Sequence, residues 1–276
     1  MTKWRLISDP PADGPANMAL DEAILERAAA SPVEPTLRLY GWETATLSLG
    51  SRQPASGSHE LGWLLDRGLG LVRRPTGGRA VLHEHERTYA VVARLDAPPF
   101  DGGVIATYRT LAATLVRALE LLGLPARAGD APSDPGPGAD PVCFARPGPL
   151  EIEVDGRKVI GSAQLRRRGA FLQHGSILLR ADAARWSAAI GREADPAAFA
   201  GIEDLLGRRV RVDELDAALV AAFEERLGAR FERAEYGDAE RLRAAELRCW
   251  KYDSGAWTFE GRIGERERRW GTGIGS

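Results

Sequence analysis

The chain has few of the residues on which several classes of protein depend. Its 276 residues include two cysteines, Cys143 and Cys249, so we expect neither a disulfide scaffold nor a zinc site built from several cysteines. No run approaches the roughly 18 apolar residues of a membrane span, and the first residues contain no apolar signal core. We therefore expect a cytoplasmic protein with no membrane partner and no bound metal.

Charge is nearly balanced, with 37 Lys and Arg residues against 39 Asp and Glu residues and a net charge of −2. A dedicated nucleic-acid binder usually shows a strong basic excess, so no nucleic-acid partner is expected. The apolar fraction of 44% and the charged fraction of 28% are ordinary for a globular domain.

Lysine is scarce, because only three of the 37 basic residues are lysine and the other 34 are arginine. A compact ammonium and a planar guanidinium are not equivalent, and the lysine pKa moves on burial. A lysine inside a motif therefore carries more information here than in an average sequence. The three lysines are Lys3, Lys158 and Lys251, and the four histidines are His59, His83, His85 and His174.

Hydrophobic periodicity predicts a mixed α+β fold. The pattern at residues 105–122 repeats apolar positions at spacings of three and four, which gives one apolar helix face. The carboxylates of Asp21 and Glu22 are expected to interact favourably with the dipole of a helix at 16–29, because they lie in its first turns. The first half is predicted to hold strands at 4–7, 36–40, 46–49, 70–74 and 88–95, and helices at 16–29, 59–66 and 105–122.

A long loop divides the chain, because residues 125–149 contain seven prolines and four glycines. Such a segment forms neither a helix nor a central strand, and loops of this length are usually functional or disordered. An antiparallel meander should follow, with Asp155-Gly156 as a hairpin signal. Its strands are predicted at 150–154, 158–166 and 170–179, followed by helices at 182–190, 212–227 and 239–248 and a strand near 231–236.

The segment Arg73–His83 combines adjacent glycines with arginines. Gly77 and Gly78 allow the backbone to approach a ligand closely, and arginines suit an anionic or carbonyl oxygen. The alternative is a tight turn with solvated arginines. The candidate substrate-binding residues here are Arg74, Thr76, Gly77, Gly78, Arg79, Ala80, Val81, Leu82 and His83.

Two strand segments of the meander add further candidates. Lys158 opens a strand whose following small residues leave room for a ligand, unless it is merely a hairpin lysine facing water. His174 lies on the last strand, where a half-buried structural histidine is the alternative. The candidate residues are Lys158, Gly161, Ser162, Ala163, Gln164 and His174.

Cys143 lies inside the long loop, beside Arg146. A loop cysteine near cations can act as a thiolate nucleophile, although an inert side chain is the alternative. Cys249 lies at a predicted helix end before Trp250 and is interpreted as structural.

Together these residues resemble the lipoate/biotin protein ligase superfamily. Three segments carry the resemblance: Asn17–Glu22, Arg73–His83, and Asp155–Gln164 continuing to Gln173–Gly175. The resemblance implies a class II synthetase/biotin-ligase-like catalytic domain, in which mixed or antiparallel sheets are flanked by helices. Residues 1–180 would form its core, and residues 181–276 a helical part of the same domain or a small subdomain.

Two features are similar to the octanoyltransferase branch of Gram-positive type. Cys143-Phe144 precedes Lys158 by 15 residues, with Glu151-Ile152 between them. Arg79 stands where ATP-dependent ligases typically have a third glycine, and its bulk disfavours close approach of a nucleotide.

This branch implies transfer of octanoyl from acyl carrier protein, through a Cys143 thioester, to a lysine of a lipoyl domain or glycine-cleavage H protein. No cofactor would be needed. Lys158 would lie at the acyl group and favour the thiolate, and either Lys158 or His83 would accept the proton of the incoming amine. Residues 166–168, three arginines at a hairpin tip, either dock an acidic carrier or form a solvated turn.

Three alternatives remain open within and beyond the family. An ATP-dependent lipoate-protein ligase would need ATP and Mg²⁺ and would form an adenylate. A lipoyl amidotransferase would move an acyl group between two carrier proteins. A non-catalytic carrier-binding protein would keep the fold and transfer nothing.

Overall fold

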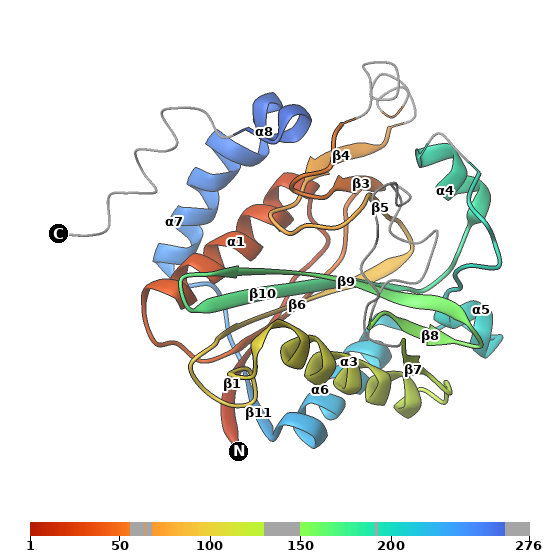
Figure 1. Ribbon diagram of the computed structural model, residues 1–276, viewed down its shortest axis with the longest axis horizontal. Coiled ribbons are helices and arrows are strands. Elements are labelled where there is room, and N and C mark those ends of the chain that lie inside the picture. The colour runs from red at the N-terminus through yellow and green to blue at the C-terminus, as the bar shows by residue number, and fades with distance from the viewer. Residues whose placement is uncertain (56–63, 65–67, 130–149, 191–192, 263–276) are drawn as a thin grey trace.

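The computed structural model describes residues 1–55, 64, 68–129, 150–190 and 193–262 (Figure 1). Its centre is an eight-stranded mixed sheet in the order β11-β1-β2-β6-β10-β9-β8-β7. β11, β1 and β2 run parallel, and every other neighbouring pair is antiparallel. The strands are β1 (Thr2–Ser8), β2 (Thr36–Tyr40), β6 (Glu86–Arg94), β7 (Arg127–Ala128), β8 (Ile152–Val154), β9 (Arg157–Arg167), β10 (Ala170–Leu178) and β11 (Ala229–Arg233).

A second, three-stranded sheet in the order β4-β3-β5 lies beside one end of the large sheet (Figure 1). β3 pairs with β4 in parallel and with β5 antiparallel. Its strands are β3 (Thr46–Leu49), β4 (Gly70–Arg73) and β5 (Val81–His83), of which β5 falls inside a segment for which no strand was predicted.

Helices cover both faces of the large sheet. α1 (Gly14–Ala30) packs on β6 and β10 and is itself covered by α7 (Asp238–Leu247), whereas α3 (Gly103–Leu121) and α6 (Val212–Leu227) pack together on the other face (Figure 1). The remaining helices are α4 (Ala183–Ile190), α5 (Ile202–Leu206), the π-helical η1 (Arg248–Tyr252) and α8 (Gly255–Glu260). The predicted α+β class is confirmed.

Residues after 180 contribute to the same layers as the residues before them. β11 extends the sheet beside β1, α6 packs on α3, and α7 packs on α1. None of the helices in the described parts of the chain is long and apolar enough to cross a membrane.

The predicted meander is confirmed as β8, β9 and β10. Asp155 and Gly156 both have positive φ angles, 51° and 75°, as a two-residue turn of type I′ requires. Arg168 and Gly169 repeat this pattern at the second hairpin, with φ angles of 48° and 78°. Local turn chemistry therefore sets the register of these strands.

Three sequence predictions are wrong in detail. Ile105 is 50% exposed, because the first turn of α3 lies outside the buried stripe, which includes Leu111, Leu115 and Leu119. The first turn of α1 holds no acidic residue, so Asp21 and Glu22 lie too far along the helix to stabilise its dipole. Both are buried. Cys249 is exposed rather than packed as a structural residue.

Two predicted segments lie mainly outside the described residues. The short helix expected at 59–66 is described only at Leu64, and the loop expected at 125–149 is described only up to residue 129. The described start of that loop includes β7, which pairs with β8.

Candidate active site

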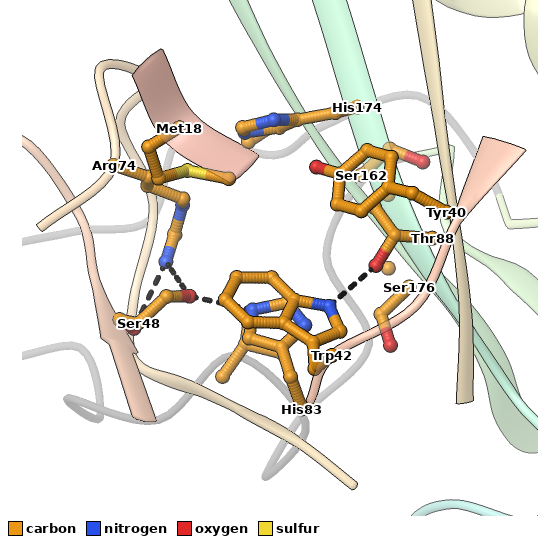
Figure 2. Close-up of a pocket in the computed structure, with 14 residues that line it drawn as sticks. Met18, Tyr40, Trp42, Ser48, Arg74, His83, Thr88, Ser162, His174 and Ser176 are labelled. Carbon is orange, nitrogen blue, oxygen red and sulfur yellow. Dashed lines mark hydrogen bonds between the residues drawn. The ribbon is translucent and has the colours of Figure 1, made fainter. Parts of the chain in front are cut away.

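A pocket opens between the small sheet and the strands β6, β9 and β10 (Figure 2). Its walls come from segments far apart in the chain, including α1, β3, β5 and β10. It is lined by Met18, Tyr40, Trp42, Ser48, Arg74, Val81, His83, Thr88, Gly161, Ser162, Ala163, His174, Gly175 and Ser176.

Arg74 fixes the glycine turn at one edge of the pocket. Its Nη2 donates to the carbonyl oxygens of Gly77 and Arg79 at 2.8 and 2.7 Å, and its Nη1 donates to Ser48. Arg74 is only 4% exposed, which rules out the alternative of a solvated arginine at this position. Its charge is therefore held inside the site.

The turn itself depends on glycine at two positions. Gly78 has a φ angle of +91°, which an L-residue with a side chain rarely adopts. A Cβ atom on Gly50 would lie 1.9 Å from the carbonyl oxygen of Gly78, so the neighbouring strand end also needs glycine. The two backbone segments are in direct contact.

His83 lies on the floor of the pocket and is held on two sides. Its Nε2 is 2.8 Å from Ser48 Oγ, and its ring stacks on Trp42 with centroids 3.9 Å apart (Figure 2). Burial lowers the pKa of His83, and the nearby carboxylate of Glu86 offsets that effect only in part. The imidazole is therefore uncharged at neutral pH.

His174 occupies the opposite wall and connects two of the sequence motifs. Its Nδ1 lies 2.8 Å from Asp21 Oδ2, and its Nε2 lies 2.7 Å from Thr76 Oγ1. Burial alone would raise the pKa of Asp21, but Arg38 and His174 outweigh it and hold this pKa below its usual value. His174 thus ties the glycine turn to a buried ion pair under the pocket.

Lys158 is completely buried on β9, and its ammonium is paired with Glu151. It is not one of the residues that line the pocket, although Gly161, three residues along the strand, is one of them. Three residues of a strand span about 10 Å. The alternative of a hairpin lysine facing water is excluded.

The other predicted residues divide by strand alternation. Ala80, Val81 and Leu82 all belong to an apolar cluster with Leu47 and Leu178, and of the three only Val81 also lines the pocket. Gln164 does not reach the pocket lining, because its amide donates to Gln173 Oε1 at 3.0 Å. Of the predicted apolar wall at 80–82, only Val81 faces this pocket.

The predicted arginine surface at 166–168 is largely engaged within the molecule. Arg166 donates to Thr107, and Arg167 donates to Glu22 and Glu26.

Cys143 lies outside the described residues. Within the described ranges, no group of three His, Cys, Asp or Glu side chains is placed to hold a metal ion.

Sequence reasoning missed several residues of the pocket. Ser48 lies in an ordinary short strand and has no local signal, whereas Ser176 belongs to the segment 173–176, of which only His174 was chosen as a candidate. Trp42 lies between two strands and could have been noticed only as one of seven tryptophans. The strand pairing brings these side chains together.

Comparison with known proteins decides the family. A model of the lipoyl protein ligase A/B catalytic domain matches residues 13–224. The chain belongs to this family. The octanoyltransferase LipM of Kyrpidia tusciae is 39% identical over 274 residues, covering 94% of this chain and 99% of that one. LipM of Moorella thermoacetica is 39% identical over 265 residues, covering 92% and 97%.

Solved structures agree with this assignment. A lipoate-protein ligase A bound with ATP has a TM-score of 0.78 at 26% identity, covering 95% of this chain and 99% of that one. A bi-partite lipoate protein ligase from Thermoplasma acidophilum, solved in a study that included its E2 lipoyl domain, has a TM-score of 0.74 at 26% identity, covering 96% and 98%. The predicted family, the biotin-ligase-like fold class and the predicted acyltransferase class of enzyme are confirmed.

Proposed function

We propose that the chain moves an octanoyl group from acyl carrier protein to a lysine of a lipoyl domain or glycine-cleavage H protein, in the cytoplasm and without a cofactor. The observation that carries the proposal is the 39% identity to LipM octanoyltransferases over nearly the whole of both chains. The pocket lining agrees with it, because it combines apolar side chains with an arginine and two histidines.

The first half-reaction is an exchange of thioesters. The Cys143 thiolate attacks the octanoyl carbonyl, a new carbon–sulfur bond forms, and the bond to the carrier's thiol breaks. Free cysteine has a pKa near 8.5, so lowering it to about 7 requires roughly 2 kcal/mol in favour of the thiolate. The buried Lys158 ammonium is the group proposed to supply it, since a close cation favours the charged sulfur.

The second half-reaction forms an amide. The uncharged amine of the acceptor lysine attacks the thioester, the carbon–nitrogen bond forms, and the Cys143 sulfur leaves as the thiol with the proton that the nitrogen loses. The Arg74-held turn would stabilise the oxyanion through the backbone N–H groups of Gly77 and Gly78. Met18, Trp42 and Val81 would contact the acyl chain.

A lipoate ligase is the second candidate, because the similar lipoate-protein ligase A was solved with ATP. It would activate a free acid as an adenylate and would form no acyl-enzyme. Arg79, which is partly buried, stands where such ligases typically have a third glycine, and its bulk argues against close approach of a nucleotide.

The test supplies a lipoyl domain with either octanoyl acyl carrier protein alone or octanoate plus ATP and Mg²⁺. The proposal predicts octanoylation of the lipoyl domain with the first mixture only. Octanoylation that occurs only with the second would establish the ligase, and binding of the carrier without transfer in either mixture would establish a non-catalytic protein.

A further inference from the structure

Arg73 is buried next to the pocket residue Arg74 but does not line the pocket itself. It ends β4 and is only 1% exposed. Within the described ranges, its guanidinium donates hydrogen bonds to backbone carbonyl oxygens alone. A buried charge needs such partners, and here they come from two separate segments of the chain.

The first segment is the C-terminal helix α8, which packs on β4 (Figure 1). Arg73 Nε donates to the carbonyl oxygens of Trp257 and Thr258 at 2.8 and 3.1 Å, and a cation suits the carbonyl end of a helix. Trp257 Nε1 donates in return to the Arg73 carbonyl oxygen at 2.8 Å. These reciprocal bonds fasten to β4 a helix that lies beyond the matched family domain, residues 13–224.

The second segment is the turn at 50–53, which follows β3. Arg73 Nη1 donates to the carbonyl oxygens of Gly50 and Gln53 at 2.7 and 2.6 Å. The same turn reaches the edge of the pocket, because the Ser51 N–H donates to the Thr76 carbonyl oxygen at 2.8 Å. One guanidinium therefore connects α8 to the residue that begins the glycine turn.

We propose that Arg73 is a positioning residue for acyl transfer and that α8 holds it in place. This inference rests on the proposed octanoyl transfer. The docked helix fixes Arg73, Arg73 fixes the turn at 50–53, and that turn fixes Thr76. Release of α8 would leave the buried guanidinium without part of its acceptors, so both turns would lose their fixed positions. The C-terminal segment thus acts on the pocket without lining it.

The first test measures local stability in the full-length protein. Trp257→Phe removes the Nε1 donor but keeps an aromatic ring beside Lys251. We expect the Ser51 amide to exchange its hydrogen about fivefold faster or more, measured by mass spectrometry, while β1 and β2 exchange as before. The matched control is Trp250→Phe, because the Trp250 ring faces Arg243 on α7.

A kinetic readout separates positioning from stability. For octanoyl transfer from acyl carrier protein to a lipoyl domain, we expect Trp257→Phe to lower kcat about 10-fold and to change KM for either carrier less than about threefold. A purely structural role would lower the urea midpoint and leave kcat of the folded fraction unchanged. Arg73→Lys keeps the charge, but its single nitrogen cannot serve both segments, so we expect a larger loss of kcat.

Three results would overturn the inference: unchanged exchange at Ser51 in Trp257→Phe, a kcat within about twofold of the unsubstituted enzyme, or equal losses in Trp250→Phe. These outcomes differ from a failure of the proposed function, in which the unsubstituted enzyme itself would transfer no octanoyl group. In that case the exchange at Ser51 still decides whether α8 holds the turn.

Discussion

Lys158 and Lys251 are both buried, and each is paired with a glutamate, yet their surroundings differ. Lys251 Nζ lies 2.6 Å from Glu22 and 4.2 Å from the centre of the Trp257 ring. Lys158 is paired with Glu151 on a strand that continues into the small residues of the pocket wall. Lys251 is enclosed by aromatic rings, whereas Lys158 lies on the strand whose residues 161–163 line the pocket.

The difference shows that the scarcity of a residue type is a weak guide to its role. Two of the three lysines are buried, and only Lys158 shares a strand with residues that line the pocket. The residues near each lysine differ. Gly161, Ser162 and Ala163 are small and line the pocket beside β9, whereas the rings of Tyr252 and Trp257 lie close to Lys251. We therefore expect Lys158 to serve the proposed reaction and Lys251 to serve the fold.

The largest expected effect is on the rate of octanoyl-enzyme formation. Lys158→Arg keeps a positive charge but replaces a compact ammonium by a planar guanidinium in a fully buried site. We expect the rate to fall about 30-fold or more, measured by mass spectrometry in a single turnover. Lys251→Arg is the matched control and should stay within about twofold. An equal fall in both variants would remove the distinction between the two lysines.

The second effect is on stability and should appear at Lys251. Removing one partner of a buried ion pair leaves the other charge uncompensated, which typically costs about 3–5 kcal/mol. We expect Lys251→Met to lose that amount in urea unfolding, while the octanoyl transfer of its folded fraction is retained. Lys3→Met, at an exposed ion pair, should leave the free energy of unfolding nearly unchanged. A stable Lys251→Met protein would contradict the structural assignment.

The third effect concerns acid stability. Burial by itself would raise the pKa of Glu22, but Lys251, Tyr252 and Arg167 outweigh it and hold this pKa below 4.5. A carboxylate with a lowered pKa stabilises the fold above its unfolded pKa, and this contribution is lost as pH falls through the folded value. The stability difference between the unsubstituted protein and Lys251→Met should therefore narrow below about pH 4. If the difference in stability between the two proteins stayed constant from pH 7 to pH 3, Glu22 would not be the source of that difference.

The smallest effect is expected at Arg167, the half-exposed third partner of Glu22. Arg167→Gln removes the positive charge that pairs with Glu22 from the surface side. It should lower the free energy of unfolding by up to about 1 kcal/mol, as for other partly exposed pairs. Octanoyl transfer should not change. A loss of stability comparable to that of Lys251→Met would show that Glu22 depends on the partly exposed Arg167 as much as on the buried Lys251.

Local patterns were enough to predict most strands around the pocket, though not β5, because turn chemistry and alternation act over a few residues. Asp155-Gly156 sets the β8–β9 hairpin, and it was correctly predicted. Asp21 was misinterpreted because its partner Arg38 lies on β2, 17 residues away, and no helix pattern reveals it. Glu22 pairs with Lys251, 229 residues away, which is further beyond the reach of local rules.

The site shows the same limit. Arg74, Val81 and His83 were proposed from one contiguous motif and line the pocket, whereas Thr76, Gly77, Gly78 and Arg79 of the same motif are not among its lining residues. Ser48 and Ser176 were missed because strand pairing, and not sequence spacing, brings them to the pocket. The role of Cys143 remains a prediction from the sequence alone.

The central claim is that the acyl group passes through Cys143, and the most direct measurement locates it. The full-length enzyme is mixed with octanoyl acyl carrier protein without ATP, its intact mass is taken, and the adduct is mapped by peptide digestion. The account predicts one octanoyl group on Cys143, which is absent in Cys143→Ala and retained in Cys249→Ser. An adduct on the exposed Cys249, or transfer that proceeds in Cys143→Ala, would contradict it.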